Sequence, residues 1–185
     1  MNQNDLRVIK TRKNIQTALI ILLQKKNFSK ITVQDILNQA MINRTTFYKH
    51  YQDKYQLVEI MCNEIFQIAK AGIEERFQCT ATNDLIQCVK ELYQKLLSEK
   101  ELILALFCIH TETIHLYEDM IILLRQMFCQ FYLRKHQNDE MMADYFSSLY
   151  ASMVMTTINW CLIKDKGFEE LEKNSDFFIK LQELI

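Results

Sequence analysis

The sequence predicts an all-α protein of about nine helices. Among its 185 residues are two glycines and no proline, so the residues that form tight turns and β-hairpins are almost absent. Hydrophobic residues make up 49% and charged residues 24%, which is typical of a globular protein that buries a substantial core.

Three observations bear on the compartment. Unbroken apolar runs, such as ALIILL at residues 18–23, are much shorter than a membrane span, and no signal-peptide pattern follows Met1. The six cysteines are scattered without a CxxC pair, as reduced and buried thiols would be. We therefore expect a cytoplasmic protein with no membrane segment.

Apolar periodicity and capping residues divide the chain into helices. Thr32 is a suitable N-cap, with Asp35 three residues later as in a capping box, and Asp53 is a suitable cap for a long helix. The only glycine at a plausible helix end is Gly167. The predicted helices cover residues 5–25, 33–40, 44–50, 54–79, 82–97, 100–111, 113–136, 138–165 and 168–185.

The beginning of the chain has the pattern of a helix-turn-helix unit. Two short helices about three residues apart lie between longer ones. Residues 1–60 carry ten Lys or Arg and four acidic residues, a balance of +6, which leaves −7 for the remainder. This asymmetry indicates a basic module for a polyanion joined to an acidic module with another role. The predicted domains are residues 1–53, which bind DNA, and residues 54–185.

The short helix at residues 44–50 has two different faces. Phe47 and Tyr51 fall together on one face and are expected to pack inward. The opposite face combines cationic, hydroxyl and aromatic groups: Arg44, Thr45, Tyr48 and Lys49.

The segment from Phe28 to Met61, FSKITVQDILNQAMINRTTFYKHYQDKYQLVEIM, resembles the DNA-binding domain of the tetracycline-repressor (TetR) family of bacterial transcription regulators. The residues that carry the resemblance are Phe28, Thr32, Asp35-Ile36-Leu37, Thr46-Phe47-Tyr48-Lys49-His50-Tyr51, Lys54 and Leu57. The resemblance implies a three-helix helix-turn-helix domain followed by a helical effector-binding and dimerisation domain. It also implies a homodimer formed by the last two helices, a palindromic operator in double-stranded DNA, and repression relieved by an unknown small-molecule effector.

Three positions depart from the family pattern. Ala and Gly are common in the family where this chain has Leu37 and Met41, and Gly is frequent at the position of Thr45. A methionine in the left-handed conformation would cost ~1–2 kcal/mol, so we expect the turn at Met41 to be formed differently.

The resemblance places the helix at residues 44–50 in the major groove. Arg44 is suited to a bidentate contact with guanine, Thr45 to a hydrogen bond or a thymine methyl contact, and Gln34 to a base. Tyr48 and Lys49 reach base edges or phosphates, while the remaining residues are expected at the DNA backbone. The predicted DNA-binding residues are Gln34, Arg44, Thr45, Thr46, Tyr48, Lys49, His50 and Lys54.

Sites in the acidic part are less specific. An aromatic set is suited to an apolar effector, although for each member taken alone ordinary core packing is the favoured role: Phe66, Tyr93, Phe107, His110, Tyr117, Phe128 and Trp160. Cys108, Glu112 and His115 would share one face of a helix and carry zinc-ligand chemistry, which leaves a metal-responsive regulator as an alternative. A coactivator or protein-interaction module is a second alternative. No cofactor or catalytic residue is predicted, because the chain lacks a nucleophile–base motif and a Gly-rich phosphate loop.

Overall fold

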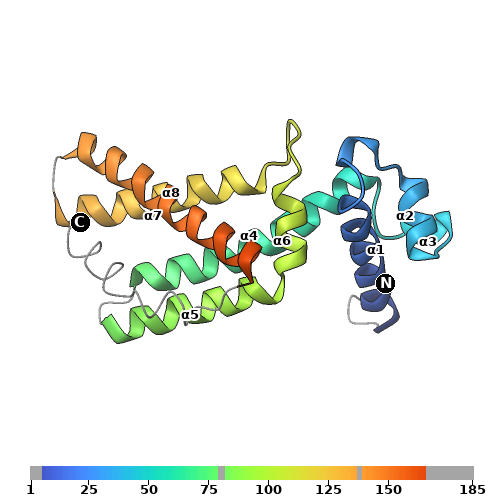
Figure 1. The fold of residues 1–185 in the computed structure, drawn as a ribbon, viewed down its shortest axis with the longest axis horizontal. Coiled ribbons are helices and arrows are strands. Elements are labelled where there is room, and N and C mark those ends of the chain that lie inside the picture. Colours follow the sequence, from blue (N-terminus) through green and yellow to red (C-terminus); the bar gives the residue numbers. More distant parts are fainter. Residues whose placement is uncertain (1–5, 79–81, 137–138, 166–185) are drawn as a thin grey trace. The chain divides into compact units, whose positions relative to one another are not determined.

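Helices dominate the computed structural model, which describes residues 6–78, 82–136 and 139–165 (Figure 1). The all-α prediction is confirmed, since these ranges contain eight α-helices, one short 3-10 helix and no strand. The predicted ninth helix at residues 168–185, with Gly167 before it, lies outside the described residues. The helices are α1 (Leu6–Leu23), η1 (Phe28–Lys30), α2 (Val33–Ala40), α3 (Arg44–Tyr48), α4 (Lys54–Gln78), α5 (Thr82–Ser98), α6 (Lys100–Phe107), α7 (Leu116–Lys135) and α8 (Glu140–Lys164).

Helix boundaries follow the predicted caps closely. Thr32 caps α2, and the Asp53 carboxylate accepts the Gln56 backbone N–H at 2.8 Å at the start of α4. Asp139, which was not named as a cap, caps α8. Three helices differ most from the prediction. Helix α6 ends at Phe107 and not at residue 111. Helix α3 ends at Tyr48, because the His50 N–H bonds to the Phe47 carbonyl in a tighter turn. Helix α7 begins only at Leu116, after a turn organised by Thr111.

The chain divides into two compact units, each of which has its own core. One comprises the residues up to Glu64 together with Glu101–His115, and the other comprises Ile65–Lys100 together with the residues from Leu116 onward. Helix α4 is continuous and contributes residues to both. The predicted functional boundary between residues 53 and 54 stays a prediction.

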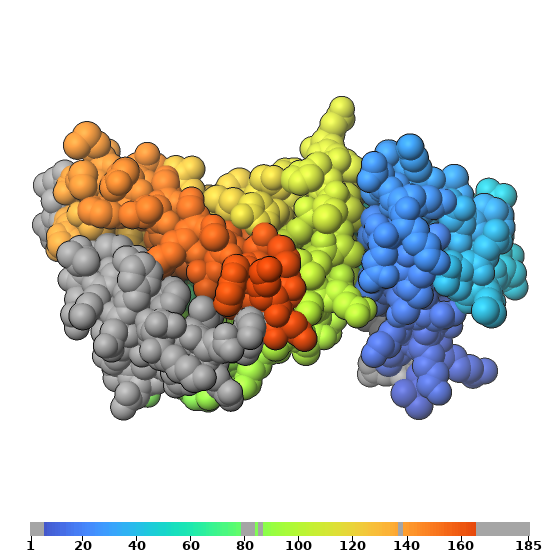
Figure 2. Space-filling model, in the orientation of Figure 1, coloured from blue at the N-terminus to red at the C-terminus, as the bar shows by residue number. Residues whose placement is uncertain are grey.

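The core of the first unit joins α1 to the helices that follow it. Ile15 and Leu19, one helical turn apart on α1, are fully buried together with Ile36 of α2 and Phe47 of α3. The Asn14 side-chain amide also donates to the Ala40 carbonyl at 2.7 Å, which satisfies a terminal carbonyl of α2. These contacts hold α3 at the surface of this unit (cyan in Figure 2).

In the second unit α7 packs extensively against α8. The small residues Ala143, Ser147 and Ala151 lie on the buried face of α8, so they serve the core of the subunit itself. Gly72 of α4 allows a similarly close approach to α5, since a Cβ there would lie 2.6 Å from Leu92 Cδ1.

Helix α8 is apolar on two faces. Opposite its buried face, large apolar side chains recur at helical spacing and are exposed: Met141, Tyr145, Leu149, Trp160 and Ile163. Among the described residues, α8 is the one helix whose length and composition would allow it to cross a membrane. The sequence-based expectation of no membrane segment considered only unbroken apolar runs, which are short in α8. The criterion of helix length and mean hydropathy is also met by a core helix that has a second apolar face.

Candidate nucleic-acid interface

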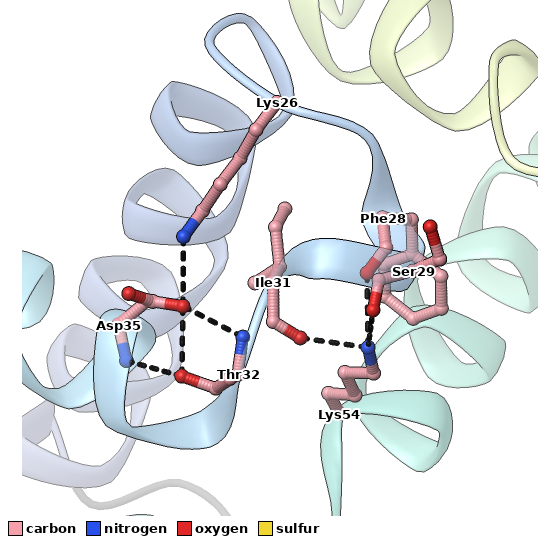
Figure 3. Close-up of polar contacts among 7 residues, drawn as sticks. All are labelled: Lys26, Phe28, Ser29, Ile31, Thr32, Asp35 and Lys54. Carbon is pink, nitrogen blue, oxygen red and sulfur yellow. Dashed lines mark hydrogen bonds and ion pairs between the residues drawn. The ribbon is translucent and has the colours of Figure 1, made fainter.

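The start of α2 is fixed by a capping box that a lysine extends (Figure 3). The Thr32 backbone N–H donates to Asp35 Oδ2 at 2.7 Å, and the Asp35 backbone N–H donates to Thr32 Oγ1 at 3.1 Å. Lys26 Nζ lies 2.8 Å from the same carboxylate oxygen. The bond from Lys26, followed by those from Thr32, holds the pKa of Asp35 well below its ordinary value. Lys26 was not predicted for this role.

The turn between α2 and α3 has the form that a glycine would ordinarily take. Met41 adopts φ 52° and ψ 43°, in the left-handed region. The Met41 N–H bonds to the Asn38 carbonyl, and the Ile42 N–H bonds to the Leu37 carbonyl at 3.1 Å. This pair of bonds is the Schellman motif. The expectation that Met41 forms the turn differently is therefore wrong: the methionine accepts the strained conformation, and its side chain is 92% exposed.

Helix α3 has the two faces that the sequence predicts. Phe47 and Tyr51 are buried and their rings are 5.7 Å apart. The other face is exposed and consists of Arg44, Thr45, Tyr48 and Lys49. The buried face anchors this short helix, and the side chains on its other face are exposed and do not pack in the core. This explains how so short a helix can present a defined exposed surface.

Contacts within α3 orient two of the predicted residues. Arg44 Cζ lies 5.6 Å from the centroid of the Tyr48 ring, a cation–π distance. Asn43 caps the helix, and its side-chain oxygen accepts both the backbone N–H and the hydroxyl of Thr46 at 2.8 Å. The Thr46 hydroxyl proton is therefore used in the hydrogen bond to Asn43 in this structure. An Asn directly before a helix is a recognisable N-cap, so the sequence contained a signal for Asn43.

His50 and Gln34 lie outside α3. Burial lowers the pKa of His50, and the charges of Arg12 and Lys49 lower it further, so the imidazole is neutral at neutral pH. Gln34 on α2 is exposed and its amide donates to the Asn38 side chain at 2.9 Å.

Lys54 differs from the other predicted residues because its ammonium points into the protein (Figure 3). Lys54 Nζ donates to the carbonyls of Phe28, Ser29 and Ile31 at 2.9, 3.4 and 2.7 Å. It also lies 4.6 Å from the centroid of the Phe28 ring. Burial lowers the pKa of Lys54, against the raising effect of Asp35. All three donors of the ammonium are directed to η1, so the geometry ties α4 to the segment before α2 instead of presenting a cation to phosphate.

The predicted effector residues do not form one described group. Phe107 and His110 belong to the first unit, whereas the others belong to the second. Tyr93 and Phe128 are buried, and Trp160 lies on the exposed face of α8. Their use by an effector stays a prediction. The set is Phe66, Tyr93, Phe107, His110, Tyr117, Phe128 and Trp160.

The expectation that Cys108, Glu112 and His115 share a helical face is wrong. Helix α6 ends at Phe107, and the segment that follows is a turn in which the Thr111 N–H bonds to the Ile114 carbonyl at 3.0 Å. The i, i+4 and i+7 spacing of these three residues places side chains on one face only within a helix, and this segment is not helical. Within the described ranges, no three His, Cys, Asp or Glu side chains are grouped closely enough to hold a metal ion.

Sequence comparison relates the N-terminal unit to known regulators. Residues 15–61 match the family model described as bacterial regulatory proteins, tetR family. Over 68 residues the chain is 40% identical to an HTH-type transcriptional regulator, YxbF, of Bacillus subtilis (strain 168). That alignment covers 34% of this chain and only 18% of the length of the relative.

Structure comparison extends the likeness over nearly the whole chain. The dihydroxyacetone kinase operon activator DhaS matches with a TM-score of 0.58 and 20% identity, covering 96% of this chain and 97% of the other. A gamma-butyrolactone receptor, an ArpA-like protein, matches with a TM-score of 0.60 and 13% identity, covering 98% and 100%. At these identities the likeness shows the fold alone.

Proposed function

Because the chain belongs to the tetR family of bacterial regulatory proteins, we propose that it binds operator DNA and regulates transcription, as a repressor released by a small-molecule effector. The observation that carries the proposal is the exposed face of α3. This face presents a guanidinium, hydroxyls and an ammonium on a helix anchored from behind by Phe47, as a recognition helix requires.

The roles follow from the chemistry of each side chain. Arg44 reads guanine through its two parallel donors, and Thr45 contacts a thymine methyl or accepts a hydrogen bond. Tyr48 and Lys49 reach base edges or phosphates from the next turn. Thr46, His50 and Gln34 stand at the margin of this surface, and the excess of basic residues in positions 1–60 supplies the salt-dependent attraction to phosphate.

The test is a double substitution on α3, Tyr48→Ala with Lys49→Ala. Both side chains are exposed, so the variant is expected to keep its helical circular dichroism and thermal stability. It is expected to lose gel-shift binding to the DNA that flanks its own gene. Lys95→Ala, on the exposed surface of α5, is the matched control and should bind like the wild type. Unchanged affinity of the double variant would refute the assignment.

A homodimer on a palindromic operator is part of the proposal. The exposed apolar face of α8, defined by Met141, Tyr145, Leu149, Trp160 and Ile163, supports self-association, because a second copy would remove it from water. Light scattering is expected to give about twice the chain mass of 22.2 kDa. Leu149→Glu should yield a folded monomer with weakened operator binding, and a dimer of unchanged stability would contradict this interface.

Regulation by an effector is proposed to pass through α4. This helix contributes residues to both units without interruption, so a ligand bound in the second unit can bias the recognition helices through it. A reporter gene placed behind the protein's own promoter provides the measurement. Repression by the wild type, and its loss in the Tyr48→Ala/Lys49→Ala variant, is the expected result.

A further inference from the structure

Arg76, in the part of α4 that belongs to the second unit, is unusual for its burial. It is 8% exposed, and among the described residues it is the one charged side chain that is buried. A guanidinium stays protonated in proteins, so the charge is present whatever the surroundings. Such a residue requires an explanation, because removing a charge from water is strongly unfavourable unless a partner compensates it.

The surroundings of Arg76 are aromatic. Its Cζ lies 4.4 Å from the ring centroid of Phe77, 5.8 Å from that of Phe131 and 5.7 Å from that of Tyr150, so α4, α7 and α8 each contribute a ring. The cluster continues inward, where Tyr150 stacks on Phe128 with centroids 4.5 Å apart. Burial raises the pKa of the Tyr150 phenol, and the neighbouring Arg76 only partly opposes this rise, as expected in an apolar environment.

These rings compensate the charge incompletely. In the described ranges no carboxylate pairs with Arg76, whereas the exposed Arg125 on α7 pairs with Asp144 at 2.8 Å. The cation–π contacts to three rings offset part of the cost of burying the charge, but they do not give the guanidinium a counter-charge. A guanidinium has five N–H donors, and a hydrogen bond joins Arg76 to the Tyr150 phenol oxygen. Neither that oxygen nor the rings offer the bidentate, charge-assisted geometry of a carboxylate.

The positive potential of the cluster is increased by a second cation. Lys135 Nζ lies 4.6 Å from the centroid of Phe131, the same ring that Arg76 contacts. Lys135 itself is exposed. The cluster therefore combines apolar surface with an excess of positive charge, which suits a ligand that has an apolar body and one negative charge.

We propose that Arg76 is the anion-binding residue of the effector site, and that the effector is an apolar carboxylic acid. The inference rests on the proposed function, since it names the ligand class of that regulator. The carboxylate accepts two parallel N–H donors from the guanidinium, while the hydrocarbon or aromatic part of the ligand packs on the rings of Phe77, Phe131 and Tyr150. A dianionic phosphate fits less well, because its second charge would remain uncompensated beside these rings.

The proposal separates a ligand-binding arginine from a structural one. A structural arginine would make the subunit less stable when replaced, whereas a buried charge that is only partly compensated can be replaced by an apolar side chain without loss. Arg76→Met is therefore expected to have an unchanged or higher Tm in the absence of ligand. A markedly lower Tm would assign Arg76 to the core and overturn the proposal.

The binding test uses a series of acids as probes: benzoate, phenylacetate, octanoate and decanoate, each with its amide. At least one acid is expected to raise the Tm of the full-length wild-type protein, and its amide should have little effect. Arg76→Gln and Arg76→Met should bind that acid at least tenfold more weakly by calorimetry. Arg125→Gln, an exposed arginine on α7, is the matched control and should respond like the wild type.

Two results would overturn the proposal: no acid of the series stabilises the wild type, or the Arg76 variants respond as the wild type does. Gel-shift measurements keep this failure distinct from failure of the proposed function. Loss of DNA binding in the Tyr48→Ala/Lys49→Ala variant tests α3 without any acid present. A wild type that binds the acid through Arg76 and does not bind DNA would refute the regulator and leave the carboxylate site intact.

Discussion

Replacing Met41 with glycine is expected to stabilise the protein. Met41 ends α2 at φ 52° and ψ 43°, where its Cβ is crowded by the backbone. Glycine has no Cβ and adopts this conformation without strain. The methionine side chain is 92% exposed, so its removal uncovers almost no buried surface. The two backbone bonds of the Schellman motif do not involve the side chain and should persist.

The size of the effect follows from two opposing contributions. Relief of the left-handed conformation favours the folded glycine variant by ~1–2 kcal/mol. The greater freedom of glycine in the unfolded chain removes roughly 0.4–1 kcal/mol of that gain. A net increase of about 1 kcal/mol in the free energy of unfolding is expected. For a chain of this length it corresponds to a rise in Tm of about 2–4 °C.

Thermal unfolding followed by circular dichroism at 222 nm provides the assay, at one fixed protein concentration because an oligomer makes Tm concentration-dependent. Met41→Ala is the matched control. It removes the same flexible side chain but keeps the Cβ, so its Tm should stay close to that of the wild type. The reasoning is refuted if Met41→Gly is no more stable than the wild type, or if Met41→Ala is stabilised equally.

Two further predictions concern the polar contacts around η1 and α2. Lys54→Gln should lower stability by about 1–3 kcal/mol, because three carbonyls lose their ammonium partner, while the salt dependence of DNA binding stays unchanged. Lys49→Gln should show the reverse: an unchanged Tm and a dependence of log K on log salt concentration that is smaller by about 0.9. If instead Lys54→Gln reduced this salt dependence and left the Tm unchanged, Lys54 would be a phosphate contact after all. The pKa of Asp35 lies below its ordinary value of 3.8, so the carboxylate stabilises the fold above that pH, and the contribution is lost as the pH falls through the lower folded value. Asp35→Asn should therefore lose less stability than the wild type when the pH falls from 5 to 2, and equal losses in the two proteins would contradict this account.

Much of the fold could be predicted from the sequence because its signals are local. Capping residues fix where a helix begins through bonds to the next three residues, so Thr32 and Asp53 located two helix starts correctly. Helical periodicity likewise predicted that Phe47 of α3 and Tyr51, just after the helix, both face the core. The same reasoning failed after Phe107, where the Thr111 turn replaced a helix and separated the proposed metal ligands.

Tertiary structure decided the features in which a side chain meets residues distant in the sequence. Lys54 lies more than twenty positions from the carbonyls that it binds, so no local pattern distinguishes it from a lysine that contacts phosphate. Arg76 resembles a solvated helical charge until α7 and α8 bring Phe131 and Tyr150 around it. Local propensity by itself determined the helices and the exposed chemistry of α3. The burial of a charge, and with it the proposed ligand class, depends on packing between helices, because desolvation is a property of the whole environment.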